Sequence, residues 1–409
     1  MPNHTPPQNG WEMTEPSTAL TSFLSTLPIT PRLLGMGEPT HGVDAFPAWR
    51  NRIFRSLVEH HGYRSIAIES DVLAGLRVDA FITSGQGTLD EIMQDGFSHG
   101  FGEVKANREL VTWIREFNAG RDEADRVRFY GFDAPTETMW AASPRDSLLE
   151  LHAYLAGHLP DLPSDRDSII RLCGDDARWT NQAAAMDSTQ SIGASENAKQ
   201  LRWLADELLT LLETEMPHLA VQPDEFWHAR LHARTAQGLL RYHAVMADSS
   251  PNRVARMLSL RDVMMADNLT AIAERETPRG PTLVFAHNSH LQRHFSQWTF
   301  GTMHLEWCPA GVHLAARMGE RYAFIATTIG QGVGLPVPPP TTLEGWLNQQ
   351  TSSPHLYLTQ ALVRVLPPSL TKRPDTSGNP GYSPLKPEHL QQTDGVFFLP
   401  TLTTRESNQ

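Results

Sequence analysis

The chain has 409 residues, 40% hydrophobic and 20% charged, a composition typical of a soluble globular protein of one or two domains. A formal net charge of −12 without any cluster of Lys and Arg argues against binding to nucleic acid. Because the chain has two cysteines, no secretory signal and no apolar run of the roughly 20 residues that span a membrane, we expect a cytoplasmic protein without membrane partners.

The N-terminal part of the chain has the pattern of an α/β core. Residues 1–16 read as a loose polar leader, and apolar residues at helical spacing predict a short helix over 17–27. Residues 33–42 read as a short buried strand that stops where two glycines and a proline follow the apolar run. A helix then ends near Gly62, and residues 65–69 form a second buried strand. Such a strand–helix–strand unit predicts parallel strands joined by a right-handed crossover.

The same pattern continues to residue 133. Residues 73–95 are predicted to be mostly helical, and 96–105 are irregular and rich in glycine. An amphipathic helix is predicted over about 107–118. A third buried strand covers 127–132, and Asp133 stands directly at its end.

The middle of the chain, residues 141–275, is predicted to be helical, with no convincing strand. We interpret it as a helical insertion in the α/β core that forms one wall of a pocket. Its long amphipathic segments are 148–156, 198–212, 226–245 and 253–272.

The strand pattern returns after residue 275. Residues 281–286 and 322–329 are predicted as strands, and 356–358 and 396–399 are weaker strand candidates. Residues 367–394 are rich in Pro, Ser and Gly and predict a long loop, a candidate lid.

These elements predict an α/β fold with a mostly parallel central sheet flanked by helices. A helical subdomain is expected to be inserted over the carboxyl ends of the strands. The predicted divisions are 17–140 for the first part of the core, 141–275 for the insertion and 276–400 for the second part of the core.

Acidic residues and histidines follow four of the five stronger strands. Ligands of open parallel sheets bind beyond the carboxyl ends of the strands, so these side chains predict a site there. We expect Asp71, Asp133 and His290 to contact the substrate. The complete set of strand-end residues is Glu38, His41, Glu69, Asp71, Asp133, His287 and His290.

His41 is the strongest candidate for a catalytic group. An imidazole titrates near neutral pH and relays a proton when a carboxylate fixes its tautomer, and both Glu38 and Glu69 are candidates for that carboxylate. The alternative is that His41 caps the following helix while Glu38 pairs with Arg50. Arg50 itself either orients a carboxylate or ester carbonyl at the site, or forms an ordinary surface ion pair.

His287 and His290 follow a buried strand directly, where an imidazole can donate a hydrogen bond to a developing oxyanion. The same neighbourhood offers a zinc alternative, with Glu38, His41, Glu69 and His287 as ligands. Because no HExxH or CxxC framework is present, we expect no bound metal.

Two further motifs match known patterns only in part. Residues 96–100 have the form G-x-S-x-G, but Ser98 lacks the buried strand before it and the helix after it that a nucleophile elbow requires. His228 and His232 have the spacing of HExxH with alanine in place of the glutamate, so we interpret both as ordinary helix residues.

An ordered set of short blocks, spread over roughly residues 33–335, resembles the erythromycin esterase family. The pair G-E-x-T-H-G and A-H-N-x-H, in this order, is its most specific part. The blocks are residues 37–42, 67–69, 107–109 with the following helix, Arg261 and Asp262 with Met265 and Asn268, and 285–290.

The resemblance implies a hydrolase that opens the lactone of 14-membered macrolides with water, without a metal or a covalent acyl-enzyme. It also implies an α/β core with a helical subdomain over a deep cleft. By the same resemblance, His41 is the general base, Glu69 its orienting carboxylate and His287 the oxyanion or leaving-group partner. Glu38 and Arg50 take supporting positions. We therefore expect a small ester or lactone as substrate and no cofactor.

Two other functions stay open at this point. One is a zinc-dependent hydrolase that uses the same Glu and His residues. The other is a non-catalytic protein that binds a hydrophobic ligand. The sequence also leaves open the true ester, the choice between antibiotic resistance and biosynthetic tailoring, and the oligomeric state.

Overall fold

The computed structural model describes residues 10–137 and 140–402, and the chain divides into two compact units. None of the helices in these ranges combines the length and the apolar character needed to cross a lipid bilayer. The first unit comprises Met1–Phe132, Leu269–Gln297 and Cys308–Gln409, and the second comprises Asp133–Asn268 and Trp298–Trp307.

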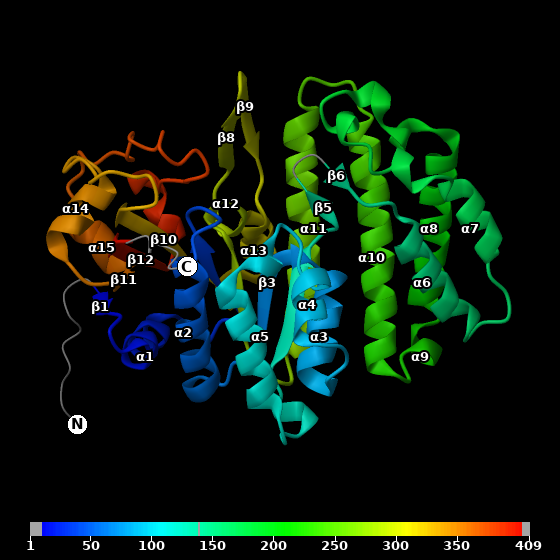
Figure 1. Cartoon of the computed structure of the whole chain (residues 1–409), viewed down its shortest axis with the longest axis horizontal. Coiled ribbons are helices and arrows are strands. Elements are labelled where there is room, and N and C mark those ends of the chain that lie inside the picture. The colour runs from blue at the N-terminus through cyan, green and yellow to red at the C-terminus, as the bar shows by residue number, and fades with distance from the viewer. Residues whose placement is uncertain (1–9, 138–139, 403–409) are drawn as a thin grey trace. The chain divides into compact units, whose positions relative to one another are not determined.

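A mixed eight-stranded sheet with the order β1–β11–β12–β10–β2–β7–β3–β4 forms the centre of the first unit (Figure 1). Strands β12, β10, β2, β7 and β3 run parallel to one another. At one edge, β11 pairs antiparallel with β12, and β1 pairs antiparallel with β11. The predicted α/β fold is therefore confirmed. The strands are β1 Gly10–Glu12, β2 Leu33–Glu38, β3 Ser65–Asp71, β4 Arg128–Asp133, β7 Thr282–His287, β10 Tyr322–Gln331, β11 His355–Leu358 and β12 Gly395–Thr401.

Helices flank this sheet, and α2, α3 and α5 lie side by side over it (Figure 1). In α5, Leu110, Val111 and Ile114 fall on one face at helical spacing and are fully buried, which explains why this segment folds as an amphipathic helix. The helices are α1 Pro16–Thr26, α2 Ala45–His60, α3 Ala74–Ser84, α4 Leu89–Asp95, α5 Lys105–Asn118, α12 Asn288–Leu291, α13 Ala310–Met318, α14 Leu343–Gln350 and α15 Thr359–Val365, with 3₁₀ turns at Phe101–Glu103, Glu123–Asp125, Gly319–Arg321 and Pro387–Gln392.

The second unit is mainly helical and has its own apolar core. Leu151, Leu201, Leu208 and Leu240 are among the buried side chains that pack together there. The predicted helical segments are confirmed by α6, α8, α10 and α11. Its helices are α6 Arg145–Ala156, α7 Arg166–Cys173, α8 Glu196–Thr214, α9 Met216–Leu219, α10 Pro223–Met246 and α11 Arg253–Glu276, with 3₁₀ turns at Asp176–Arg178, Gln182–Ala185, Ser188–Gln190 and Ile192–Ala194. Its strands form two pairs, β5 Thr136–Glu137 with β6 Trp140–Ala141 and β8 Ser296–Phe300 with β9 Met303–Trp307. Helix α11 ends in the first unit, and β8 begins there.

The prediction of a loose leader over residues 1–16 is wrong from residue 10 onward. Gly10–Glu12 pairs with β11 as an edge strand, and Met13 is fully buried. Residues 1–9 lie outside the described part of the chain. A strand of three residues is too short to show a periodic pattern, so its pairing with a segment far along the chain was not predictable.

The prediction that the first strand stops at its glycines is also wrong. Strand β2 continues through Gly35 and Gly37 to Glu38, because β10 and β7 supply hydrogen-bonding partners on its two sides. At Gly37, a Cβ atom would lie 2.2 Å from Oδ1 of Asn288. This glycine therefore allows a close approach between chain segments and does not interrupt the strand.

Candidate active site

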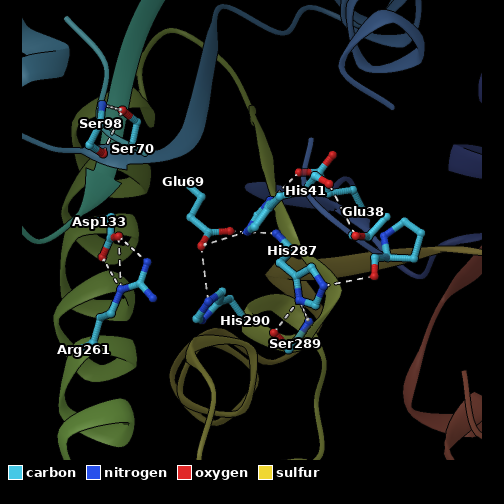
Figure 2. Close-up of polar contacts among 12 residues, drawn as sticks. Glu38, His41, Glu69, Ser70, Ser98, Asp133, Arg261, His287, Ser289 and His290 are labelled. Carbon is cyan, nitrogen blue, oxygen red and sulfur yellow. Dashed lines mark hydrogen bonds and ion pairs between the residues drawn. The ribbon is translucent and has the colours of Figure 1, made fainter. Parts of the chain in front are cut away.

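Four of the predicted catalytic residues lie together at the ends of three neighbouring strands, β2, β7 and β3, in the first unit (Figure 2). They are Glu38, His41, Glu69 and His287. Glu38, the last residue of β2, stands opposite His287, the last residue of β7. Glu69 lies near the end of β3. Parallel strands end at the same edge of a sheet, so side chains far apart in sequence meet there.

His41 lies in the loop after β2, between two carboxylates. Its Nδ1 is 2.7 Å from Oε1 of Glu38, and its Nε2 is 3.7 Å from Oε1 of Glu69. Glu38 and Glu69 are buried, whereas 42% of the His41 side chain is exposed. Its ring meets the ring of Phe101 edge-on at 5.5 Å. His41 is thus the accessible member of this cluster, and Glu38 is its closer partner.

Two parts of the alternative interpretation, a capping role for His41 and a surface position for Arg50, are wrong. Helix α2 has Asp44 at its N-cap without any side-chain cap, so His41 does not cap it. Arg50 is buried, donates two hydrogen bonds to Asn51 and lies over the ring of Phe285 at 5.0 Å. It is therefore not a surface ion pair.

Glu69 connects the other members of the cluster. Its Oε2 accepts a hydrogen bond from the main-chain N–H of His287 at 2.8 Å. Its Oε1 is 3.3 Å from Nε2 of His290, the last-but-one residue of α12. One buried carboxylate therefore holds the end of β7 and faces two imidazoles.

Both ring nitrogens of His287 have partners within the protein. Nδ1 accepts a hydrogen bond from the main-chain N–H of Ser289 at 3.2 Å and lies 2.5 Å from its hydroxyl. Because Nδ1 is an acceptor, the ring proton resides on Nε2, which donates to the carbonyl oxygen of Pro39 at 3.1 Å. His287 therefore carries its ring proton on Nε2, and this N–H points at the loop that bears His41.

The surroundings shift the pKa values of these two imidazoles in opposite directions. Burial lowers the pKa of His41, but the negative charges of Glu69 and Glu38 and their hydrogen bonds outweigh it and raise the pKa to about 10. Burial, together with the charge of His41, lowers the pKa of His287 to about 3. The ring centroids are 5.2 Å apart. Titratable groups whose pKa values are pushed apart within one site are candidates for an acid and base pair.

The carboxylates differ as well. Burial raises the pKa of Glu38, an effect that the hydrogen bond and charge of His41 oppose. For Glu69, the effect of burial is outweighed by the charges of His290 and His41, which hold its pKa well below the ordinary value. Glu69 is thus ionised, and Glu38 is the carboxylate more readily protonated.

A small pocket adjoins Glu38. Arg50, Phe101, Asn107 and Phe285 are among the residues that line it. Oδ1 of Asn107 is buried without a hydrogen-bond partner among the described residues. Most of the residues that line the pocket are apolar, and the polar ones are Glu38, Asp44, Arg50 and Asn107.

The predicted substrate contacts are dispersed. His290 joins the cluster through Glu69. Asp71 accepts hydrogen bonds from the main-chain N–H groups of Leu73 and Ala74 and so holds the start of α3. Asp133 lies in the second unit and pairs with Arg261. A role for Asp71, Asp133 or His290 in binding substrate stays a prediction.

Ser98 occupies a structural contact. Its hydroxyl accepts a hydrogen bond from the main-chain N–H of Asp71 at 2.8 Å and lies 3.3 Å from the hydroxyl of Ser70 (Figure 2). It is followed by Gly100 and a short 3₁₀ turn, so the strand–serine–helix order of a nucleophile elbow is absent here. His228 and His232, in the other partial motif, lie on α10 of the second unit.

Comparison with known proteins decides the family. A family model described as erythromycin esterase matches residues 58–402. The chain belongs to the erythromycin esterase family. It is accordingly an esterase, a carboxylic ester hydrolase. The matched range begins after Glu38 and His41, so the assignment of these two residues depends on the geometry described above.

Two curated relatives come from Escherichia coli. Erythromycin esterase type I is 26% identical over 313 residues, which cover 74% of this chain and 71% of the relative. Erythromycin esterase type II is 24% identical over 309 residues, which cover 74% of this chain and 70% of the relative.

Solved structures share the fold of this esterase family member. A Bacillus cereus protein aligns with a TM-score of 0.70 and 19% identity over 93% of this chain and 90% of that one. A mutant of the erythromycin esterase EreC in its open conformation aligns with a TM-score of 0.66 and 21% identity over 93% of both chains. A succinoglycan biosynthesis protein aligns with a TM-score of 0.69 and 19% identity over 95% of this chain and 92% of that one.

The zinc alternative requires Glu38, His41, Glu69 and His287 to converge on one ion. Within residues 10–137 and 140–402, no group of three or more His, Cys, Asp and Glu side chains is arranged to hold a metal ion. Nδ1 of His41 faces Glu38, and both nitrogens of His287 are engaged by Ser289 and Pro39. Three of the ring nitrogens that the zinc alternative would use are therefore engaged by other groups of the protein, and the absence of a bound metal stays a prediction.

Sequence reasoning missed the groups that hold the imidazoles in place. These are the carbonyl of Pro39, the ring of Phe101 and the main chain of Ser289. Pro39 and Ser289 had a sequence signal, because they belong to the block 37–42 and to the His-Asn-Ser-His segment after a buried strand.

Proposed function

We propose that this protein hydrolyses a small-molecule ester, and within that class the lactone of a macrolide, by attack of an activated water. The observation that carries the proposal is a half-exposed His41 held between the buried carboxylates of Glu38 and Glu69. Family membership supports hydrolysis of macrolide esters, the substrate class that the names of the Escherichia coli relatives give.

In the proposed reaction, His41 is the general base. Its neutral form takes a proton from water through Nε2 while the water oxygen attacks the ester carbonyl. Glu38 holds the opposite nitrogen, Nδ1, and stabilises the imidazolium that forms. Buried Arg50 supports the ionised form of Glu38, because its charge lowers the pKa of that carboxyl against the larger opposite effect of burial. A positioned general base contributes typically about 10²–10⁴-fold to the rate.

His287 is the proposed partner of the oxyanion. Its Nε2–H leaves the carbonyl of Pro39 and donates to the oxygen that becomes negative when water adds. When the tetrahedral intermediate collapses, the carbon–oxygen bond to the alkoxy group breaks, and the proton held by His41 passes to that leaving oxygen. The products are a carboxylic acid and an alcohol. A single oxyanion donor is worth about 10²–10³-fold.

The test is mass spectrometry of macrolides and simpler lactones and esters incubated with the wild-type protein. The same panel is run with His41→Ala and with His60→Ala, since His60 is an exposed histidine at the end of α2. We expect a product one water heavier with wild type and His60→Ala, and a rate lower by about 10²–10⁴-fold with His41→Ala.

The results test the reaction mechanism and the identity of the substrate separately. Hydrolysis of a macrolide makes antibiotic resistance the working role. Hydrolysis of other esters keeps the mechanism and discards the macrolide. Turnover by His41→Ala above about a tenth of the wild-type rate contradicts the assignment of the base.

A further inference from the structure

The carbonyl oxygen of Pro39, two residues before His41, accepts two hydrogen bonds. One comes from Nε2–H of His287 at 3.1 Å, and the other comes from the main-chain N–H of Ser383 at 2.7 Å. Pro39 is buried. Since a carbonyl oxygen has two lone pairs, these two donors fill its capacity.

The proposed chemistry removes one of the two donors. When His287 turns its N–H to the oxyanion, a buried carbonyl held by His287 alone would be left without any hydrogen bond. A buried polar group that loses its only partner carries the full penalty of desolvation. The N–H of Ser383 prevents this, because it stays on Pro39 throughout.

We infer that the main-chain amide of Ser383 is a positioning group for ester hydrolysis: it keeps the Pro39 carbonyl satisfied while His287 moves to the substrate. The inference depends on the proposed role of His287. The group acts through Pro39 and His287 and touches no reacting atom.

Ser383 is held by neighbours that do not take part in that movement. The hydroxyl of Tyr382, a buried residue, lies 2.8 Å from the hydroxyl of Thr328 on β10, and Thr328 donates to Glu344 at 2.9 Å. The amide is therefore anchored to a central strand of the sheet and does not follow His287 when it moves.

A second contact joins the same loop to the residue next to His41. The hydroxyl of Thr40 donates to Oδ1 of Asn379 at 3.2 Å, and Nδ2 of Asn379 donates to the carbonyl of Val333 at 3.2 Å. Pro39 and Thr40 are thus both bound by residues 379–383. We interpret this part of the predicted long loop as a support for the His41 loop.

The experiment compares Ser383→Pro, which has no N–H, with Ser383→Ala, which keeps it. For Ser383→Pro we expect kcat to fall by about tenfold or more while KM stays within about twofold, because the lost bond matters only after His287 has left Pro39. Ser383→Ala, which keeps the main-chain N–H, should have the wild-type kcat. Wild-type kcat in Ser383→Pro, or a raised KM with unchanged kcat, overturns the inference.

A double variant separates this role from a merely structural one. In a His287→Ala background no imidazole leaves Pro39, so adding Ser383→Pro should lower the residual kcat by less than about twofold. A further tenfold loss in that background overturns the inference.

A second variant covers a failure of Ser383→Pro to fold, judged by circular dichroism. Tyr382→Phe removes the hydroxyl that anchors Ser383 and is expected to lower kcat about threefold at constant KM. Its control is Tyr63→Phe, since the Tyr63 hydroxyl is buried without a partner among the described residues. Equal kcat in the two variants overturns the inference.

The same assay shows which proposal fails. If His41→Ala and His287→Ala keep wild-type kcat, the proposed function is wrong. If they lose activity while Ser383→Pro and Tyr382→Phe do not, only the role of Ser383 is wrong.

Discussion

Two charged clusters at strand ends differ in whether a titratable side chain is exposed to solvent. In the second unit, Nε and Nη2 of Arg261 donate to both oxygens of Asp133, whose side chain is fully buried. In the first unit, His41 lies between Glu38 and Glu69 with 42% of its side chain exposed. Both clusters gave the same sequence signal, an acidic residue at the end of a buried strand. The difference teaches that such a residue marks a candidate catalytic site only where its partner titrates and meets solvent.

Asp133 gives the largest expected effect on stability. Asp133→Ala removes the carboxylate to which Nε and Nη2 of Arg261 donate, and because this breaks a buried ion pair we expect the free energy of unfolding to fall by about 3–5 kcal/mol. Urea denaturation followed by circular dichroism measures it. The same variant tests the predicted substrate contact, because KM for the ester stays near the wild-type value if Asp133 serves only to pair with Arg261. A raised KM with unchanged stability would instead make Asp133 a substrate contact.

A matched double variant sharpens this result. Replacing both members of a buried ion pair by apolar residues of similar volume is often neutral or stabilising. Asp133→Leu combined with Arg261→Met should therefore be more stable than Asp133→Ala. If the double variant is the less stable of the two, the ion pair stabilises the fold beyond neutralising two buried charges.

Glu344 is a buried carboxylate outside both clusters. Burial raises its pKa from 4.5 to about 7. The folded state therefore binds its proton more tightly than the unfolded state, and this stabilisation is lost as pH rises from about 4.5 through 7. From pH 5 to pH 8, the stability of wild type relative to Glu344→Gln should fall by about 2–3 kcal/mol. Thermal unfolding of both proteins at the two pH values checks this, and a difference independent of pH contradicts it.

Ser98 should give the smallest effect. It holds the end of β3 through its bonds with Ser70 and Asp71 and is not assigned to the reaction. We expect Ser98→Ala to keep kcat within about twofold and to lose about 1 kcal/mol of stability. Covalent labelling of Ser98 by a fluorophosphonate, with loss of activity, would replace the water mechanism by a serine mechanism.

Local patterns in the sequence predicted the strands and the titratable residues that stand at their ends. Buried apolar runs followed by Glu38, Glu69 and His287 indicated three strand ends, and these strands are neighbours in the sheet. Spacing did not decide whether Glu38 or Glu69 holds His41. That choice depends on side-chain rotamers and on the path of the loop. They place Oε1 of Glu38 2.7 Å from Nδ1 of His41, and Oε1 of Glu69 3.7 Å from its Nε2.

Contacts between distant segments were not predictable. Thr40 and Asn379 are 339 positions apart, and a pattern within a short window carries no information about such a pair. The close approach of Asn288 to Gly37 is of the same kind, and it turned an expected strand stop into a continuous strand. The contacts that hold the site in place could therefore be found only in the structure, whereas its titratable residues could be named from the sequence.

The central claim is that His41, made basic by its carboxylates, activates water. Its most direct test is the pH dependence of kcat/KM for wild type and Glu38→Gln, on an ester that the protein hydrolyses, after subtraction of the uncatalysed rate. With a His41 pKa of about 10, wild-type kcat/KM should rise with pH and level off near that value. In Glu38→Gln the loss of one negative neighbour lowers this pKa, so the plateau should come at lower pH. A wild-type profile that is flat from about pH 7 to pH 10, or a profile that Glu38→Gln leaves in place, would contradict the claim.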